Sequence, residues 1–274
     1  MRIHPILIIF IFISFFTGSF FHLLVILTLV FIHELGHFIA AKFYKWKISH
    51  IKLWVFGGVL VTEEYSHKPL REQLIVTLSG PFQHIILYFI IFLCSYYNIF
   101  SVSLIDLLLT YNTMILLFNF IPIWPLDGGR VLFILFCARF PYRKAFTRTI
   151  ITSIICALVL LLFQLIFYSF TLSAILIMLY LIVENVSEWK QRYFVFIRFL
   201  FQKYYGDNNV DGKHFFTVSE NTKLIDVLSL FKLEKLNVIT VQHNKGKLLQ
   251  ITEKDCLNYF FSKSKSQEAI GKLL

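Results

Sequence analysis

Charged residues are scarce in this chain: Asp, Glu, Lys and Arg make up 15% of its 274 residues, whereas a typical soluble domain has about 25%. None of them occurs between Ile3 and His33 or between Thr149 and Val183. Uncharged runs longer than about 18 residues are typical of membrane-spanning helices, and 57% of this chain is apolar. This composition excludes a disordered chain, a secreted disulfide scaffold and an ordinary soluble enzyme.

Cysteine is also sparse, and its four occurrences are isolated: Cys94, Cys137, Cys156 and Cys256. No two of them form a CxxC pair, which leaves a zinc ribbon or a thiol redox motif without support. We expect free thiols that behave as small apolar side chains.

The uncharged segments predict an α-helical polytopic membrane protein with about six transmembrane helices. The predicted spans lie near Pro5–Phe16, Phe21–Ala41, Gln73–Tyr96, Ser103–Phe120, Phe146–Phe167 and Leu172–Val183. The first and the last are short for a hydrocarbon core about 30 Å thick, because a helix rises only about 1.5 Å per residue.

Basic residues are concentrated after the second, fourth and sixth predicted spans, whereas the connections after the other spans contain none. By the positive-inside rule, the basic segments and both termini lie in the cytoplasm. The formal net charge of +10 then reflects topology in the first part of the chain and, after the last span, attraction to an anionic membrane surface or to an acidic partner. Nucleic acid is not expected as a direct partner.

The composition changes after the last span and predicts three parts: a transmembrane domain at 1–186, an interfacial helix and linker at 187–211, and a cytoplasmic domain at 212–274. The interfacial assignment rests on the mixture of aromatic and basic residues between Trp189 and Tyr205. The last part predicts a small α/β domain with the order β-α-β-β-α. Because about 60 residues bury little core by themselves, we expect it to form a homo-oligomer.

The second predicted span contains the HExxH motif His33-Glu34-Leu35-Gly36-His37. On a helix the two histidines project from one face, where both can reach a Zn²⁺ ion, and Glu34 lies beside them as a proton acceptor for the activated water. Chance would produce this pattern about 0.01 times in a chain of this length and composition. The alternative is burial for packing alone, which is costly for an ionisable carboxylate in hydrocarbon.

A catalytic zinc site usually has three protein ligands, so the third is expected from another span at the same depth. The fourth span ends in the segment Asn119–Arg130, where two prolines break the helix and a Gly-Gly pair permits close approach of the backbone. Asp127 is the only acid there and, like the HExxH motif, lies near a cytoplasmic end. We predict Asp127 as the third ligand; the alternative is a loop carboxylate that pairs with Arg130.

The HELGH motif on one span and the LDGG motif on another resemble the site-2 protease family of intramembrane zinc metalloproteases, and the resemblance extends over nearly the whole chain. It implies that His33, His37 and Asp127 bind Zn²⁺ and that Glu34 is the catalytic base. It also implies that Asn119 stabilises the oxyanion or positions the substrate.

By the same resemblance, the segment after the second span forms a strand-like loop that pairs with an extended substrate. The substrate-binding residues implied are Phe56, Gly57, Gly58 and Val59. The alternative for the two glycines is a plain turn. After Gly80-Pro81 the family often has an asparagine, whereas this chain has Gln83-His84. The roles of those two residues stay open, and His84 is not expected to be an additional ligand.

The C-terminal part resembles a single cystathionine-β-synthase (CBS) domain, because Thr252-Glu253-Lys254-Asp255 matches the TxxD motif of such domains. In that family the Thr and the Asp contact the ribose of an adenine nucleotide, which implies Thr252 and Asp255 as nucleotide-binding residues and ATP as a regulatory ligand. The glycine expected three residues earlier is replaced by Leu249. The alternative is a domain for dimerisation or substrate docking only.

Three functions compete at this point. The resemblance to sporulation members of the family implies a protease that removes the pro-sequence of a sigma factor in the outer forespore membrane, facing the mother cell, with membrane-bound inhibitory partners. A zinc or cation transporter with a regulatory CBS-like domain is the second, although no inverted repeat is evident. An inactive homologue that acts as a scaffold is the third, and the intact Glu34 argues against it.

Overall fold

The computed structural model describes residues 2–3, 5–54, 57–62, 68–167, 171–206, 212–242, 248–263 and 268–273. The chain falls into two units, Met1–Pro122 with Leu126–Val131, and Ile123–Pro125 with Leu132–Leu274. The HExxH motif and the LDGG motif both belong to the first unit.

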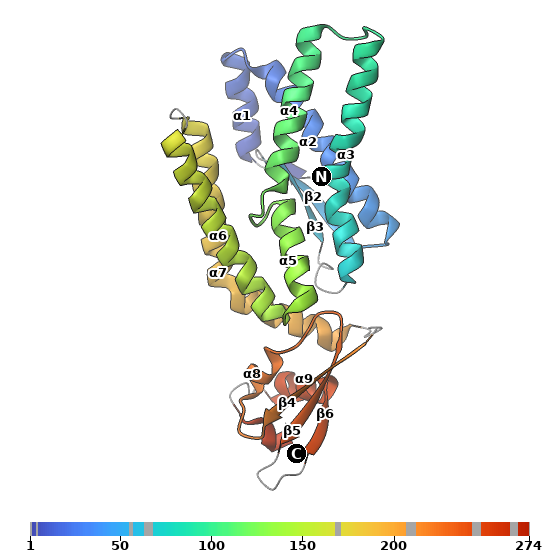
Figure 1. The fold of residues 1–274 in the computed structure, drawn as a ribbon, viewed down its shortest axis with the longest axis vertical. Helices are drawn as coiled ribbons and strands as arrows, with labels where there is room; N and C mark the ends of the chain where they lie inside the picture. Colours follow the sequence, from blue (N-terminus) through green and yellow to red (C-terminus); the bar gives the residue numbers. More distant parts are fainter. Residues whose placement is uncertain are drawn as a thin grey trace. The chain divides into compact units, whose positions relative to one another are not determined.

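Apolar helices build the first unit (Figure 1): α1 (Pro5–Phe16), α2 (Phe20–Phe43), α3 (Leu70–Tyr96), α4 (Val102–Phe120) and the first turn of α5 (Asp127–Arg139). Helix α2 packs against both α3 and α4. Their apolar contact includes the buried side chains of Val25, Leu29 and Leu87. Helix α4 ends ahead of Pro122, because the residue before a proline is pushed out of the helical region.

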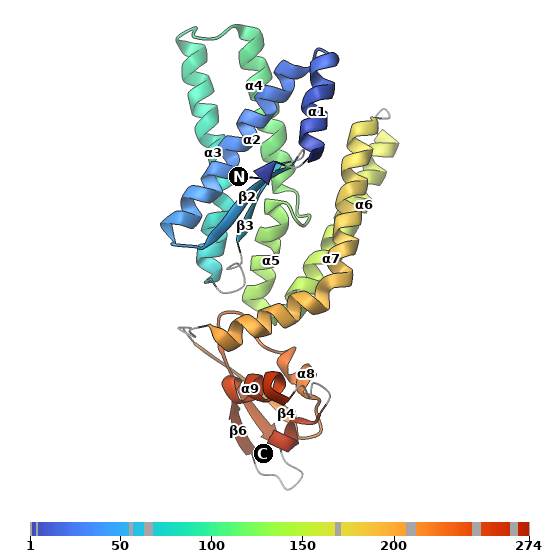
Figure 2. The same ribbon diagram turned by 180° about the vertical axis from the view of Figure 1, so that it is seen from behind.

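A three-stranded sheet in the same unit contacts α2 (Figure 2). Its order is β1-β2-β3, with β1 (Arg2–Ile3) parallel to β2 (Ile48–Trp54) and β2 antiparallel to β3 (Gly57–Thr62). Strand β3 is in contact with α2. Within the described residues, β3 is hydrogen-bonded to a strand along one edge only.

Five helices in the described part of the chain are long and apolar enough to cross a membrane: α2, α3, α4, α6 (Tyr142–Phe167) and α7 (Leu172–Tyr205). Large apolar side chains such as Phe82, Phe89 and Phe92 of α3 are more than half exposed, as expected of a surface that faces lipid rather than water. Together with the sequence, these helices describe a multi-pass membrane protein.

Five of the six predicted spans coincide with these helices of the described part of the chain, whereas a crossing of the membrane by the first predicted span stays a prediction. Helix α1 has 12 residues, which makes it about 18 Å long and shorter than a hydrocarbon core of about 30 Å. The sixth predicted span is only the beginning of α7, which continues for 34 residues. The predicted boundary at residue 186 therefore falls inside a helix, and the three-part division stays a prediction.

Helices α6 and α7 pack against each other in the second unit. Tyr142 of α6 stacks on Phe199 of α7 with the ring centroids 4.0 Å apart. The same two helices bind the loop residue Trp124, whose N–H donates to Ser153 Oγ (2.9 Å) and whose carbonyl accepts from Asn185 Nδ2. The two bonds give the backbone N–H and carbonyl of Trp124 hydrogen-bond partners, which non-helical backbone needs when it lies among apolar helices.

The C-terminal region of the second unit is a small α/β structure. Its elements are β4 (Lys213–Ser219), α8 (Leu224–Leu228), β5 (Leu236–Gln242), β6 (Leu248–Thr252), α9 (Glu253–Lys263) and the short 3₁₀ helix η1 (Ile270–Leu273). Strand β5 is central, parallel to β4 and antiparallel to β6. The order matches the predicted β-α-β-β-α, whereas a relation to CBS domains stays a prediction. The four cysteines of the chain are free, as predicted.

Candidate metal centre

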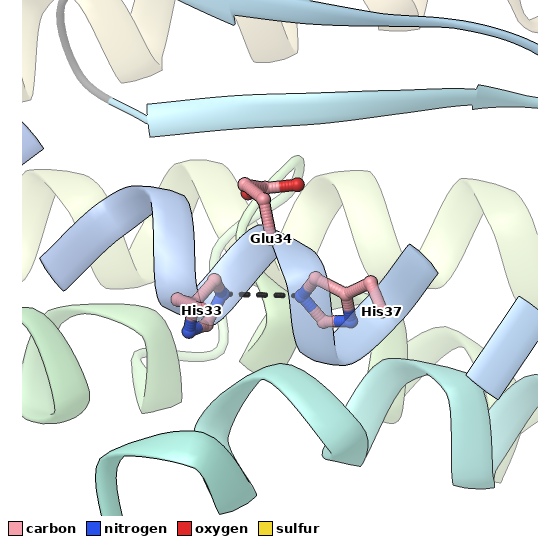
Figure 3. Close-up of side chains that lie close together, drawn as sticks. All are labelled: His33, Glu34 and His37. Atoms are coloured by element: carbon pink, nitrogen blue, oxygen red, sulfur yellow. Dashed lines mark hydrogen bonds between the residues drawn. The ribbon is translucent and has the colours of Figure 1, made fainter. Parts of the chain in front are cut away.

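Two imidazole rings converge on one face of α2. His33 and His37 lie one helical turn apart, and each is 3% exposed. Their Nε2 atoms are 3.1 Å apart, and Figure 3 shows both rings on the same side of the helix. Because residues four apart share a helix face, the HExxH spacing by itself brings these two nitrogen atoms together.

Asp127 joins this pair from the first turn of α5. Its Oδ2 lies 3.1 Å from His33 Nε2 and 3.2 Å from His37 Nε2. The carboxylate is buried at a helix N-terminus, where free backbone N–H groups favour negative charge. A Cβ atom on Gly128 would collide with backbone oxygen atoms at the end of α4. The close return of the chain after α4 therefore requires glycine next to Asp127.

The alternative partner of Asp127, Arg130, contacts the other carboxylate oxygen. Arg130 Nη1 lies 3.9 Å from Asp127 Oδ1, which is a long ion pair. Oδ2 remains directed at the two histidines. The two arrangements therefore coexist, and the pairing with Arg130 does not take Asp127 away from the imidazole rings.

The hydrogen bond of His37 determines which of its ring nitrogens has a free lone pair. His37 Nδ1 is 2.7 Å from the backbone oxygen of Val76. Because a carbonyl oxygen only accepts, Nδ1 must carry the proton. In the neutral ring Nε2 then presents its lone pair toward His33 and Asp127.

This donor set fits a zinc ion. Three ligand atoms bound to a tetrahedral Zn²⁺ at about 2.0–2.1 Å are about 3.3–3.4 Å from one another. The corresponding atoms of His33, His37 and Asp127 are separated by 3.1, 3.1 and 3.2 Å. Two imidazoles and one carboxylate are also a common ligand set of catalytic zinc, in which a fourth position is kept for water or substrate.

Glu34 lies next to this group on the same helix. Its side chain is buried, with 6% of the residue exposed. One carboxylate oxygen of Glu34, one ring nitrogen of His33 and one ring nitrogen of His37 all lie within 4.8 Å of one another. In Figure 3 its carboxylate lies on the strand side of α2, whereas the two rings lie on the side nearer α3. A carboxylate at this separation can exchange a proton with a water molecule between it and the two rings.

Two glycines that the sequence analysis did not assign to the site let α2 and α3 approach each other. A Cβ atom on Gly80 of α3 would collide with the rings of both His33 and His37. A Cβ atom on Gly36 of α2 would collide with the backbone oxygen of Ser79. The signal for this contact was a glycine inside each of two apolar spans, since small residues mark close helix packing in membranes.

His84, whose role the sequence left open, contacts His33. His84 Nε2 is 3.1 Å from His33 Nδ1, and His84 Nδ1 is 2.7 Å from Oδ1 of Asn112 in α4. His84 thus lies against the nitrogen of His33 that does not face Asp127. The signal for these two residues was a His and an Asn inside predicted membrane spans.

The side chain of Asn119 is bonded within its own helix. Its amide donates to the backbone oxygen of Ile115, one turn earlier in α4 (3.0 Å). Its role at the oxyanion stays a prediction.

The predicted substrate-binding glycines lie in a strand rather than in a turn. Gly57, Gly58 and Val59 begin β3 and pair with Trp54, Leu53 and Lys52 of β2. The fourth residue of the predicted set, Phe56, lies outside the described residues.

Thr252 and Asp255 bind each other at the start of α9. Thr252 Oγ1 donates to Asp255 Oδ2 (2.6 Å), and the Asp255 N–H donates to Thr252 Oγ1 (3.3 Å). Thr252 N–H also donates to Asp255 Oδ2 (3.3 Å). Reciprocal bonds of this kind form a capping box, which satisfies backbone donors at a helix start. These bonds show a capping role for the TxxD motif, and nucleotide binding by Thr252 and Asp255 stays a prediction.

Comparison with known proteins assigns the chain to a family. The family model of peptidase family M50 matches residues 21–102 and 97–163. The chain is 34% identical to stage IV sporulation protein FB of Bacillus subtilis over 100% of its own length and 96% of that protein. It is 32% identical to zinc metalloprotease MJ0392 of Methanocaldococcus jannaschii over 60% of this chain and 47% of that protein.

A solved structure agrees with this assignment. The site-2 protease from Methanocaldococcus jannaschii superimposes with a TM-score of 0.53 and 28% sequence identity, over 66% of this chain and 85% of that one. The residues matched by the family model include both the HExxH and the LDGG motifs. The chain is therefore a member of peptidase family M50, the site-2 proteases, and is a zinc metalloprotease of the membrane.

Proposed function

We propose that this chain hydrolyses a peptide bond in or beside the membrane, with His33, His37 and Asp127 as zinc ligands and Glu34 as the general base. The supporting observation is the convergence of three buried ligand atoms within 3.2 Å of one another, beside a buried carboxylate. Burying four ionisable groups together is costly, and coordination of a metal ion compensates for that cost.

When bound, Zn²⁺ supplies a Lewis acid that lowers the pKa of a water molecule towards about 7 and polarises a carbonyl group. Glu34 accepts the proton of the attacking water and returns it to the nitrogen of the leaving amine. Asn119 is proposed to donate its amide to the developing oxyanion in place of the backbone oxygen of Ile115, to which it is bonded here.

The substrate is proposed to bind as an extended strand along β3, with contacts from Phe56, Gly57, Gly58 and Val59. A helical substrate would hide its carbonyls in i to i−4 hydrogen bonds, so it must unwind before cleavage. Strand β3 is bonded to β2 along one edge within the described residues, and it contacts α2, the helix that carries Glu34. Backbone hydrogen bonds to the other edge would hold a peptide on the side of α2 where Figure 3 places the Glu34 carboxylate.

The proposed substrate is the pro-sequence of a membrane-associated sporulation sigma factor, and the proposed partners are membrane-bound proteins that inhibit the protease until a signal arrives. The support is the 34% identity with stage IV sporulation protein FB along the whole chain. The proposed location is the outer forespore membrane, with both termini facing the mother cell, as the distribution of Lys and Arg indicates. Pairing of the C-terminal region with a second copy stays a prediction.

Coexpression of the sigma-factor precursor with the wild-type chain and with Glu34→Gln tests the proposal. The wild type should shorten the precursor, and Glu34→Gln should leave it intact while retaining zinc, because the substitution removes the base but no ligand. A zinc chelator should stop cleavage by the wild type in detergent. Proteolysis that persists in Glu34→Gln would overturn the assignment of the base, and metal uptake into vesicles without cleavage would support a transporter.

A further inference from the structure

Two fully buried polar residues beside the metal site have no part in the chemistry described above. His84 lies in α3 and Asn112 in α4, and both are 0% exposed. Both helices are candidate membrane spans, where a polar side chain is costly unless it has partners. The hydrogen bonds of this pair lead to His33, one of the proposed ligands.

The amide of Asn112 binds His84 at two points, which fixes the orientation of the amide. Asn112 Nδ2 donates to the backbone oxygen of His84 (3.1 Å), and Asn112 Oδ1 lies 2.7 Å from His84 Nδ1. A backbone oxygen only accepts hydrogen bonds, so the NH₂ group must face it. Oδ1 therefore faces the ring as an acceptor, and Nδ1 of His84 carries the proton.

A proton on Nδ1 leaves the other nitrogen of the neutral His84 ring with a free lone pair. That atom, Nε2, lies 3.1 Å from His33 Nδ1. Only one proton fits between the two nitrogens, and it must belong to His33. Nε2 of His33 is then unprotonated, and it is the atom that faces His37 Nε2 and Asp127 Oδ2.

The two histidine ligands thus reach the same tautomer by different means. His37 is oriented by the backbone oxygen of Val76, whereas His33 is oriented by the side chains of His84 and Asn112. We propose that His84 is a positioning residue of the metal site, which together with Asn112 holds His33 in the tautomer whose Nε2 binds zinc. This inference rests on the assignment of His33 as a ligand in the proposed function.

The zinc affinity of the intact 274-residue chain in detergent, measured by competition with a chromogenic chelator, tests the proposal. His84→Leu removes the acceptor for His33 and should weaken zinc binding about 10–100-fold, the range typical of residues that orient a metal-bound histidine. His84→Gln retains a donor for Asn112 and an acceptor for His33, so it should retain most of the wild-type affinity. Zinc binding by His84→Leu that equals the wild type would overturn the proposal.

Tyr88→Phe is the matched control. Tyr88 lies one turn after His84 on α3, and its hydroxyl shares a hydrogen bond with Thr113 Oγ1, the residue after Asn112 on α4 (2.7 Å). The substitution removes one hydrogen bond between the same two helices at a residue without a bond to His33, and zinc affinity should not change. Equal losses in Tyr88→Phe and His84→Leu would overturn the proposal, because helix packing would then explain both.

If His84→Leu does not fold, the proposal can still be tested on the wild-type chain by determining which nitrogen of His84 carries the proton. Nitrogen NMR of the zinc-loaded protein labelled at histidine should show His84 with its proton on Nδ1, its signals being identified by their loss in His84→Gln. A proton on Nε2 of His84 would overturn the proposal. His33→Ala separates the two levels of inference: zinc affinity that is unchanged in this variant contradicts the ligand assignment, whereas loss of affinity here but not in His84→Leu contradicts only the positioning role.

Discussion

Each of the two units buries a cluster of polar side chains, and the two clusters are paired in different ways. In the first unit His33 Nε2, His37 Nε2 and Asp127 Oδ2 lie within 3.2 Å of one another, and all three can present lone pairs. In the second unit Lys203 Nζ lies 2.8 Å from Glu253 Oε1, so that a donor faces an acceptor.

In the second cluster, which consists of Lys203, Glu253 and Asn237, further hydrogen bonds pair other donors and acceptors. Glu253 Oε2 accepts from the backbone N–H and from the side-chain Nδ2 of Asn237, at 2.9 and 2.8 Å. Lys203 Nζ donates to the carbonyl of Lys235 at 3.1 Å. Such a cluster needs no ligand and connects α7 to the C-terminal sheet. Burial of charge by itself therefore does not identify a functional site; the proposed metal site differs in that its buried lone pairs face one another.

A side chain inserted between α2 and α3 should have the largest effect, and only on the first cluster. In Gly80→Ala the new Cβ meets the rings of His33 and His37, so the two rings cannot keep their positions. We expect cleavage to fall by at least about 100-fold, as for comparable displacements of catalytic groups, and bound zinc to be lost. Precursor cleavage and metal analysis check this. Cys94→Ala on the same helix should change neither, and a full zinc content in Gly80→Ala would contradict the account.

Breaking the second cluster should reduce stability and leave zinc binding unchanged. Lys203→Met leaves the buried charge of Glu253 without its cation, which should lower the free energy of unfolding by about 3–5 kcal/mol. Denaturant unfolding followed by circular dichroism measures the loss. The double variant Lys203→Met with Glu253→Leu should recover part of it, because no charge then remains buried. Loss of zinc in Lys203→Met would show that the two clusters depend on each other.

The capping box of α9 should contribute less. Thr252→Ala removes the side-chain cap and should lower the free energy of unfolding by about 1 kcal/mol, again without an effect on zinc. Isothermal titration of the wild-type chain with ATP should give no heat if capping is the whole role of Thr252 and Asp255. Binding heat that disappears in Thr252→Ala would identify a nucleotide site instead.

The smallest effect is expected at Cys256, which lies in α9 close to the second cluster. Burial, together with the negative charges of Asp255 and Glu253, raises the pKa of the Cys256 thiol to about 12. At pH 8 the thiol of the folded protein should therefore stay protonated and unreactive. Alkylation followed by peptide mass spectrometry should label it faster in Lys203→Met than in the wild type. If Cys256 of the wild type were labelled as fast as an exposed cysteine, the thiol would not be buried beside the second cluster as described.

The helices were largely predictable because charge is excluded from membrane spans. The predicted span Ser103–Phe120 differs from α4 by one residue at its start. The sequence analysis placed a sixth span and a separate interfacial helix where the structure has one continuous helix, α7. After Val183 the composition changes from apolar to amphipathic, but no Gly or Pro occurs before Gly206 to interrupt the helix. Composition locates the bilayer, whereas helix ends depend on backbone breakers.

The candidate metal site could be predicted from the sequence only where the spacing of residues along one helix determines which side chains meet. The HExxH pattern brings His33 and His37 together on any helix. Asp127 was suggested by its depth and by its being the only acid in the broken segment after α4. The contacts of Gly80 and His84 depend on which faces of α3 and α4 turn toward α2. Helices that are apolar all round have little sequence pattern that specifies a facing side, so those contacts required the structure.

The central claim is that Asp127 is a metal ligand and not only an ion-pair partner of Arg130, and the zinc affinity of Asp127→Asn tests it most directly. Asparagine preserves the shape of the side chain but removes the charge that balances the metal ion. We expect the intact protein carrying Asp127→Asn to bind zinc more weakly than the wild type by more than about 100-fold, whereas Arg130→Gln should bind it normally. Unchanged zinc affinity in Asp127→Asn would contradict the account.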